Sequence, residues 1–467
     1  MAETVAKASD AGQRLSVVEK VGYGLGDTAA NFIFQTMVMF QLAFYTDTFG
    51  IAAAAAGTLL VVVRVFDAAF DPVMGVIADR TNTRWGKFRP WILWTAVPFG
   101  LTAFLTFVTP DFGAGGKLAY AYLTYILLMA VYSANNLPYS ALSGVLTGDL
   151  AERTSLSSYR FVCAMLAQLI IQGLALPMVH YFGQGDSATG YQYTIGIFSA
   201  VAVLLFFITF ATTKERITPA PDQTASIGQH FADLGRNGPW LAMFVLTFIL
   251  FITLSMRGSV VLYYFKYYVG NESLFSAFNV LGTTATIIAI FFSKGLAMRF
   301  GKRKVFMAGL AGTALLTLAF LPLPPDAVRL MFTAEILRQF VYGFTIPLLW
   351  AMMADVADYS EWRTRRRATA IVFSAIVFAL KAGLGFGGAI TGYLLAFYGY
   401  VPNVAQTSAA RDGIRLTMSV FPAVGFALCA VCLFFYTIDR SAEVRITTEL
   451  KERRKLYTTP GREVASH

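Results

Sequence analysis

Three charged residues, Arg64, Asp67 and Asp71, interrupt an otherwise apolar stretch of the chain. Their spacing places all three on one face of a helix. A charged side chain near the centre of a bilayer costs about 3 kcal/mol or more, so this face must point to protein or water rather than lipid. Arg64 can neutralise one carboxylate, which leaves a charge for a proton or a metal cation to balance. A static salt bridge between helices is the simpler alternative, although it does not need the second acid.

The composition explains why such a face is unusual here. The chain has 467 residues, of which 56% are hydrophobic and 14% are charged, with a mean hydropathy of +0.59. Average soluble chains carry about 25% charged residues. The sequence therefore predicts a polytopic membrane protein. Its three cysteines lie in apolar runs and indicate neither a disulfide framework nor a structural zinc site.

The elements that position the charged face are apolar runs of about 20 residues, the length that crosses a bilayer as a helix. Twelve such runs follow one another, and none resembles a strand, so we expect an all-α membrane protein. The predicted spans are residues 21–46, 57–78, 90–109, 118–145, 161–181, 193–212, 240–264, 274–298, 305–322, 330–356, 369–398 and 414–437.

The basic residues predict the orientation of these spans. Most of the 37 lysines and arginines lie in the two tails and the even-numbered connections, and cytoplasmic segments are rich in such residues. We therefore expect both termini in the cytoplasm of a multi-pass inner-membrane protein. The net charge of +10 is explained by orientation, and no nucleic-acid partner is predicted. The first 20 residues do not resemble a cleavable signal peptide.

The chain also contains an internal repeat. The segment GVIADRTNTRWGKFR after the second span resembles KGLAMRFGKRK after the eighth, and LPYSALSGVLTGDLAERT resembles IPLLWAMMADVADYSEWRT about half the chain later. Transporters built from such repeats bind their substrate between them. The predicted domains are an N-terminal six-helix bundle (1–213), a cytoplasmic linker (214–239), a C-terminal six-helix bundle (240–437) and a cytoplasmic tail (438–467).

Three motifs, FDAAFDPVMGVIADRTNTRWGKFRPW, YSANNLPYSAL and ADVADYSEWRTRRR, are similar to those of a known family. They resemble the glycoside-pentoside-hexuronide:cation symporters of the major facilitator superfamily, the family of melibiose permease. The resemblance covers the whole chain. It implies twelve helices in two pseudo-symmetric bundles, alternating access, a working monomer in the lipid bilayer, and uptake of a sugar or glycoside with Na⁺, Li⁺ or H⁺.

The resemblance also implies where the coupling cation binds. It matches Asp67 and Asp71 to the family's cation site, with Asn136 at the position of a third carboxylate; if the cation is Na⁺, Asp67 and Asp71 are its metal ligands. No cofactor other than this cation is expected. Asn31 aligns with a further sugar-binding carboxylate of the family. An amide brings no negative charge, and losing a carboxylate weakens a Na⁺ site more than a proton acceptor, so the sequence favours H⁺ and leaves Na⁺ open.

Further charges lie within the predicted spans. Glu335 and Arg338 are three residues apart and are expected to pair with each other. Arg257 and Lys381 have no acid within a helical turn, so each needs a partner elsewhere, either the acidic face or an anionic substrate. The predicted substrate-binding residues are Asn31, Gln35, Tyr132, Asn136, Arg160, Arg257 and Lys381. This positive set favours an acidic sugar, a uronide or a sulfonated sugar; a neutral pentoside or hexoside is the alternative.

Three other classes of protein are alternatives to a symporter. An ATP-driven pump is not supported, because the chain lacks a GxxxxGK[ST] loop. An enzyme that used Asp67 and Asp71 as an acid-base pair is disfavoured by the repeat and by the lack of other catalytic groups. A non-transporting membrane sensor on the same fold remains an alternative, which substrate-dependent ion movement would exclude. The sequence predicts a transporter that is not an enzyme.

Overall fold

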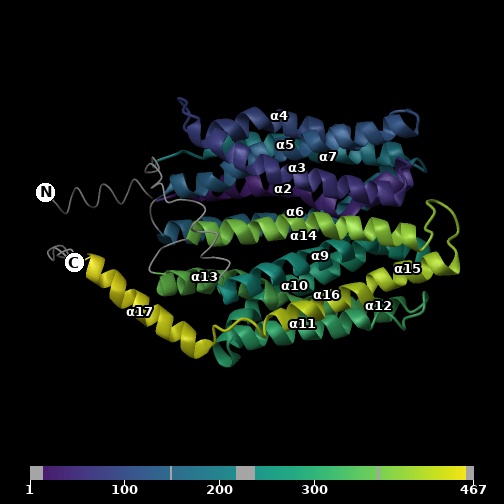
Figure 1. The fold of residues 1–467 in the computed structure, drawn as a ribbon. Coiled ribbons are helices and arrows are strands. Elements are labelled where there is room, and N and C mark those ends of the chain that lie inside the picture. The colour runs from purple at the N-terminus through teal and green to yellow at the C-terminus, as the bar shows by residue number, and fades with distance from the viewer. Residues whose placement is uncertain (1–13, 148–149, 217–236, 365–368, 459–467) are drawn as a thin grey trace. The chain divides into compact units, whose positions relative to one another are not determined.

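The computed structural model describes residues 14–147, 150–216, 237–364 and 369–458, which form helices joined by short connections (Figure 1). The first half contains α2 (Val17–Ala43), α3 (Ala53–Arg80), α4 (Arg89–Thr106), α5 (Ala114–Leu146), α6 (Leu150–Gly183) and α7 (Ser187–Thr212). The second half contains α9 (Gly238–Tyr263), α10 (Leu274–Phe300), α11 (Lys302–Leu318), α12 (Val328–Gly343), α13 (Thr345–Thr364), α14 (Thr369–Phe397), α15 (Ser408–Met418), α16 (Val420–Cys432) and α17 (Arg440–Thr458). No strand occurs within the described ranges, and the all-helical prediction is confirmed.

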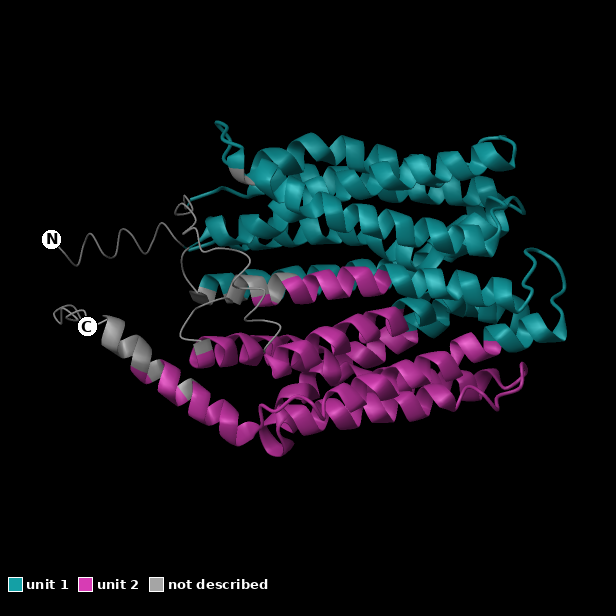
Figure 2. Ribbon diagram, viewed as in Figure 1, with its two compact units in different colours: residues 1–222, 255–280, 385–414 teal, residues 223–254, 281–384, 415–467 magenta. Residues whose placement is uncertain are grey.

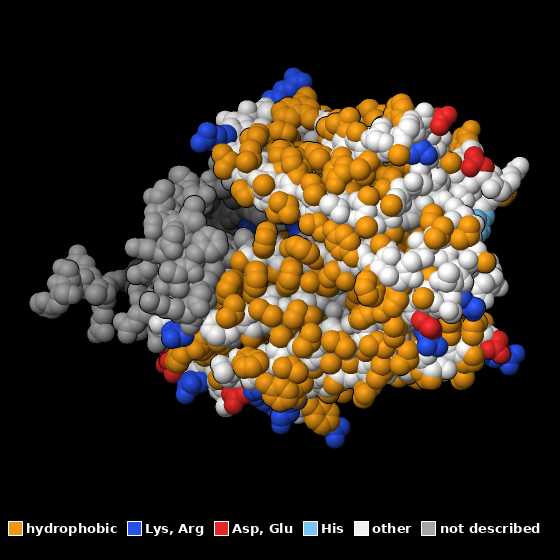
Figure 3. All heavy atoms as spheres, turned by 45° about the vertical axis from the view of Figure 1, so that its right-hand side comes forward, with side chains coloured by type: hydrophobic (Ala, Val, Ile, Leu, Met, Phe, Trp, Pro, Cys, Tyr) orange, Lys and Arg blue, Asp and Glu red, His pale blue; other side chains and the backbone are white. Residues whose placement is uncertain are grey.

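The helices carry the apolar surface that a membrane requires. Nine stretches of the described residues are long and apolar enough to span a bilayer. On the face shown in Figure 3, hydrophobic side chains cover most of the surface and charged side chains gather at its margins. Large apolar side chains such as Phe291 and Phe397 are about four-fifths exposed, which suits contact with lipid. Length and composition therefore show a multi-pass protein, while the count of twelve spans stays a prediction.

Two of the predicted spans are interrupted rather than continuous. The span 330–356 is divided between α12 and α13, and Pro347 lies in the first turn of α13, where a missing N–H costs least. The span 414–437 is divided between α15 and α16 at Ser419, whose hydroxyl donates to the carbonyl of Arg415 (2.7 Å). Pro72 and Pro138, by contrast, lie inside uninterrupted α3 and α5.

The chain divides into two compact units (Figure 2). Unit 1 contains residues 1–222, 255–280 and 385–414, and unit 2 contains residues 223–254, 281–384 and 415–467. Unit 1 thus contains the first predicted bundle together with two segments of the second half. The division into bundles 1–213 and 240–437 concerns sequence and stays a prediction, as do the limits of the linker and the tail.

The repeat is visible in two helix ends within unit 1. The π-helical turn η1 (Phe44–Thr48) extends α2, and η2 (Tyr264–Val269) extends α9. A glycine with a left-handed backbone follows each turn, Gly50 with φ 79° after η1 and Gly270 with φ 77° after η2. Glycine adopts this conformation without steric cost. Short π-helical segments frequently mark functional sites. The two halves therefore share a local structure that the hydropathy pattern does not reveal.

In unit 2 the amphipathic helix α17 packs against α13. Ile446 and Leu450 are buried in the core of the unit. Lys302 Nζ bonds both oxygens of Asp355 (2.7 and 2.8 Å) and pairs with Glu443 of α17 (2.8 Å). Burial opposes the charge of Lys302, but the bonds from these two acids outweigh it and raise the pKa of Lys302 above its ordinary value. The helix is therefore held by apolar packing and by this ion-pair cluster.

Candidate functional site

The acidic face of α3 has a buried carboxylate at its centre. Asp67 is 1% exposed, and its Oδ1 accepts a hydrogen bond from the Ser133 hydroxyl of α5 at 2.7 Å. Its Oδ2 lies 3.8 Å from Nη1 of Arg64, one helical turn away. Arg64 therefore pairs with Asp67, one of the two carboxylates that its spacing allows. Asp71 lies one turn further along α3 and is half-buried.

Asn136, the third predicted cation ligand, lies on α5 three residues after Ser133 and is half-buried. Within the described chain its side chain makes no hydrogen bond, whereas the neighbouring Asn135 donates to the hydroxyl of Thr95 (2.8 Å). Asn135 is therefore occupied in joining α4 to α5. The amide of Asn136 remains available to a ligand, which agrees with the role predicted for it but does not test it.

Arg64 is positioned by close packing of α3 on α14. A Cβ atom added to Gly385 would lie 2.0 Å from the Cγ of Arg64, so the stem of the arginine occupies the space that a side chain would fill. Gly388 and Gly392 continue this contact surface: an added Cβ would lie 2.9 Å from Leu60 Cδ1 and 2.6 Å from the Ala53 carbonyl oxygen. Small residues permit such close approach of membrane helices. Lys381 lies four residues before Gly385, half-buried in unit 2, and its contact with the acidic face stays a prediction.

A second charged pair lies in the first half. Asp27 of α2 is buried, and its Oδ2 lies 3.2 Å from Nε of Arg160 on α6. The guanidinium carbon of Arg160 lies 5.5 Å from the ring centre of Tyr139. Tyr139 stacks on Tyr23 at 4.7 Å, and each hydroxyl donates to the other residue's carbonyl oxygen. Arg160 is thus held by a carboxylate on one side and by an aromatic pair on the other.

The predicted polar residues of α2 extend from this pair. The amide of Asn31 donates to the carbonyl oxygen of Asp27 (2.8 Å), and Gln35 donates to the Asn31 side-chain oxygen (3.4 Å). Both side chains are half-buried. Asp27, Asn31 and Gln35 therefore form a polar row along one face of α2, with Arg160 beside its first member.

The remaining two predicted residues have different surroundings. Tyr132 is half-buried, and its ring centre lies 6.0 Å from that of Phe34 and 6.1 Å from that of Phe99, so aromatic packing already involves it. Arg257 is 3% exposed on the part of α9 that belongs to unit 1. A buried guanidinium needs compensating acceptors, in agreement with the expectation that it has a partner outside its own helical turn.

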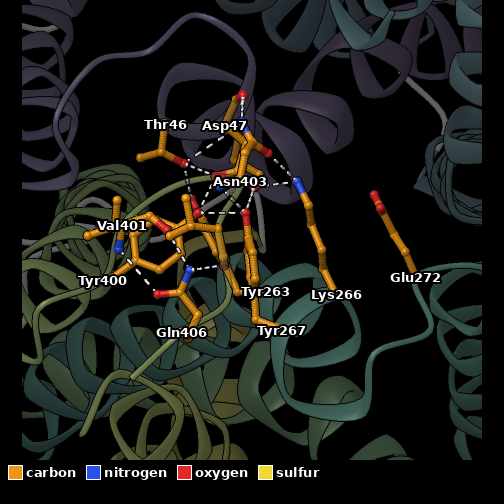
Figure 4. Close-up of polar contacts among 12 residues, drawn as sticks. Thr46, Asp47, Tyr263, Lys266, Tyr267, Glu272, Tyr400, Val401, Asn403 and Gln406 are labelled. Atoms are coloured by element: carbon orange, nitrogen blue, oxygen red, sulfur yellow. Dashed lines mark hydrogen bonds and ion pairs between the residues drawn. The ribbon is translucent and has the colours of Figure 1, made fainter. Parts of the chain in front are cut away.

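A third cluster of polar residues, which we call the Asp47 network, surrounds a carboxylate at the end of α2 (Figure 4). Oδ2 of Asp47 accepts from Lys266 Nζ (2.6 Å) and from the Tyr267 hydroxyl (2.5 Å). Its Oδ1 accepts from the Tyr400 and Thr46 hydroxyls, the latter at 2.8 Å. The Asp47 side chain is only 9% exposed. Burial beside this carboxylate raises the pKa of Tyr400 well above its ordinary value, so its hydroxyl remains a donor.

Three of these interactions were not predicted from sequence. Asp27 lies within the first predicted span, where any acid is a functional candidate, so its position in the sequence is a usable signal. Ser133 lies three residues before Asn136 and thus on the same helical face, which is a weak signal. Asp47 lies in a connection, and topology prediction counts only basic residues there.

The donor atoms available for a cation on α3 and α5 are oxygens, which suit Na⁺ or a proton. Among the described residues, no group of three or more His, Cys, Asp or Glu side chains is close enough together to hold a metal ion. Asp67, Asp71 and Asn136 therefore stay predicted as a cation site of two carboxylates and an amide.

The chain is similar to known transport proteins over most of its length. The family model described as MFS/sugar transport protein matches residues 22–440. The inner membrane symporter YicJ of Escherichia coli (strain K12) is 38% identical over 89% of this chain and 91% of its own length. The isoprimeverose transporter of Lactiplantibacillus pentosus is 36% identical over 96% of this chain and 95% of its own. The glucuronide carrier protein homolog of E. coli (strain K12) is 32% identical over 95% of this chain and 97% of its own length.

Solved structures show the same fold at low sequence identity. A bacterial homolog of the human lysosomal transporter Spinster, in an inward-facing and unoccupied conformation, aligns with a TM-score of 0.67 and 14% identity over 96% of this chain and 100% of that one. The nucleoside transporter NupG aligns with a TM-score of 0.60 and 14% identity, over 89% of this chain and 99% of that one. Because the family model and these relatives match nearly the whole chain, the chain belongs to the glycoside-pentoside-hexuronide:cation symporter family of the major facilitator superfamily, and it is a membrane transporter rather than an enzyme.

Proposed function

We propose that this protein is a secondary active symporter that imports a sugar or glycoside together with H⁺ or Na⁺ by alternating access. The observation that carries the proposal is the buried carboxylate of Asp67 on α3, bonded to Ser133 and paired with Arg64, within a chain that belongs to a family of cation symporters. A second carboxylate, Asp71, lies on the same helix. Reversible binding of a cation to these two acids would change the charge of the site during each cycle.

The orientation is part of the same proposal. Both termini lie in the cytoplasm and twelve helices cross the inner membrane, so the connections after α2, α9 and α14 are extracytoplasmic. The protein works as a monomer. The distribution of basic residues along the sequence supports this orientation.

The charged residues of the predicted substrate-binding set bear on the charge of the substrate. Asp27 pairs with Arg160 and offsets one positive charge of the predicted set. The predicted set also contains Arg257, which is buried in α9, and Lys381 of α14, which is half-buried. Because arginine and lysine suit carboxylate or sulfonate groups, we propose an acidic glycoside, such as a uronide, as the substrate, with H⁺ as the favoured cation; similarity to a glucuronide carrier protein homolog supports this choice. A neutral glycoside is the alternative, supported by similarity to an isoprimeverose transporter.

Purified protein in proteoliposomes tests both levels of this proposal. A pH gradient and a Na⁺ gradient are imposed separately at constant membrane potential, and uptake of a p-nitrophenyl glucuronide is compared with uptake of isoprimeverose. We expect uphill accumulation driven by the pH gradient and lost in Asp67→Asn, with Asp111→Asn, the same change at an exposed connection, as the control. Accumulation retained in both Asp67→Asn and Asp71→Asn would refute the mechanism, and dependence on Na⁺ alone would refute the proton assignment.

A further inference from the structure

The Asp47 network joins segments that are far apart in the chain. Asp47 lies in η1, Lys266 and Tyr267 in η2, and Tyr400 in the connection after α14. One carboxylate therefore connects residues separated by 219 and 353 positions. All of these residues belong to unit 1, and the close-up shows their side chains converging on Asp47 (Figure 4).

The bonding of this carboxylate is dense for a site near a surface. Asp47 accepts hydrogen bonds from one ammonium and three hydroxyls, so each of its two carboxylate oxygens accepts two hydrogen bonds. Hydrogen bonds that involve a charged group are stronger than neutral ones, and the low exposure of Asp47 limits competition from water. Exposed ion pairs, by comparison, contribute little.

The connection after α14 is shaped to fit the network. Asn403 has a left-handed backbone (φ 59°), a conformation that asparagine tolerates better than most residues. Its side chain donates to the Asp47 carbonyl oxygen (2.5 Å) and accepts from Lys266 (3.0 Å), and its backbone N–H donates to the Tyr267 hydroxyl (3.0 Å). Gln406 closes the same connection by bonding both the N–H and the carbonyl oxygen of Val401. The connection is thus held by bonds of its own in addition to those with Asp47.

The internal repeat gives the network a special position. η1 and η2 occupy the same place in the two halves, and the residue that precedes each left-handed glycine by three positions is Asp47 in one and Tyr267 in the other. These equivalent residues bond directly to each other. In a pseudo-two-fold arrangement, a contact between equivalent positions lies on or near the symmetry axis. The network is therefore placed where two rocking repeats meet.

From this geometry we propose that the Asp47 network is the extracytoplasmic gate of the transporter, a latch whose hydrogen bonds hold the two halves together and must all break before substrate can enter from outside. The proposal rests on the proposed alternating-access function and orientation. Opening moves Asp47 away from η2 and from the connection after α14, and water then replaces the donors that these segments supply. The strength of the latch sets the ratio of closed to open molecules.

A weaker contact in the same layer provides a matched control. His180, near the end of α6, lies 3.8 Å from Glu272, which follows η2. This pair also joins the first half to the second, but the His180 side chain is 51% exposed and the Glu272 side chain 28%. Because water and salt screen an exposed pair, its loss should change the closed-to-open ratio by less than about twofold.

The experiment measures the gate without any substrate. Cysteines replace the exposed Ala114 at the start of α5 and the exposed Ala409 at the start of α15, one in each half. They carry spin labels in a protein whose three native cysteines are replaced, and the distance between the labels is measured in lipid nanodiscs. The parent should give a single main distance. Asp47→Ala should add a longer distance and lower the closed-to-open ratio by about tenfold or more. Tyr400→Phe, which removes one donor, should cause a smaller change, and Glu272→Gln almost none.

The controls separate failure of the gate from failure of the proposed function. A distance distribution unchanged by Asp47→Ala, in protein that remains monodisperse, overturns the gate; if that variant does not fold, Lys266→Met and Tyr400→Phe decide the same question. An equal shift in Glu272→Gln also overturns it, because the effect would then not be specific to the network. A shift confined to the network variants, in a protein that moves no sugar in proteoliposomes, supports the gate and refutes the transport proposal.

Discussion

The Asp27–Arg160 pair allows a quantitative test of charge burial within the first half. Two unit charges about 4 Å apart interact by about 1 kcal/mol in water and about 4 kcal/mol near a protein surface. The Asp27 side chain is 11% exposed and that of Arg160 is 35% exposed. Because the arginine is partly screened by solvent, we expect a coupling energy of about 2 kcal/mol, between the two limits.

The difference in burial also predicts an asymmetry between single variants. Arg160→Gln leaves the more buried carboxylate uncompensated and removes the contact with the Tyr139 ring, so it should lower the free energy of unfolding by about 3 kcal/mol. Asp27→Asn leaves a partly hydrated guanidinium and should cost about 1 to 2 kcal/mol. The double variant should be more stable than Arg160→Gln alone, because no buried charge remains unpaired.

The free energy of unfolding is measured in mixed detergent micelles for the parent, both single variants and the double variant, which together form a double-mutant cycle. Asp111→Asn, the same chemical change at an exposed position, is the control and should have no effect. Sugar uptake is a second readout: if Asp27 positions Arg160 for the substrate, Asp27→Asn should raise KM more than it lowers kcat. A coupling energy below about 0.5 kcal/mol, or an Asp27→Asn variant as unstable as Arg160→Gln, would refute this reasoning.

Three further changes follow from the structure. Gly385→Ala places a Cβ 2.0 Å from the Cγ of Arg64, so it should destabilise the protein by about 1 to 3 kcal/mol and abolish uphill uptake. The control Gly144→Ala, whose Cβ meets nothing within 4 Å, should change neither the stability nor the uptake. Leu450→Ala removes a buried side chain of α17 and should cost about 2 to 5 kcal/mol in thermal unfolding; a wild-type melting curve would contradict the docking of this helix. The pKa of Tyr400 is raised, so its hydroxyl contributes fully to the closed gate below about pH 10, and this contribution is lost only as the pH rises further. The spin-label distances should therefore not change between about pH 6 and pH 9, and a transition in that interval would contradict the assignment.

The helices were predictable because the bilayer imposes a simple rule on the sequence. A run of about 20 apolar residues has few alternatives to a spanning helix, so each predicted span overlaps a helix or two consecutive ones. The interruptions near Phe344 and Ser419 were not predictable in the same way, since apolar residues continue through both. Only Pro347 marks the first of them, and Pro72 and Pro138 show that proline alone does not break a helix here.

Pairs within one helix were also predictable, because helical spacing places both partners on one face. Arg64 pairs with Asp67, and Arg338 bonds both oxygens of the buried Glu335 (2.5 and 3.0 Å). Contacts between helices were not predictable without a fold. Ser133 meets Asp67 across 66 residues, and neither hydropathy nor periodicity of one segment contains information about its partner in another.

The first helix shows why the sequence position of the partner matters more than the type of interaction. Asp27 and Asp47 lie at two levels of α2 and its η1 extension, and each carboxylate faces a cation, Arg160 for Asp27 and Lys266 for Asp47. The partner of Asp27 belongs to the same repeat, so a rigid-body movement of the repeats leaves that pair intact. The partner of Asp47 belongs to the other repeat, so the same movement breaks it. In a transporter whose halves rock against each other, the first pair should therefore persist in every state, and only the second should report whether the outer side is closed.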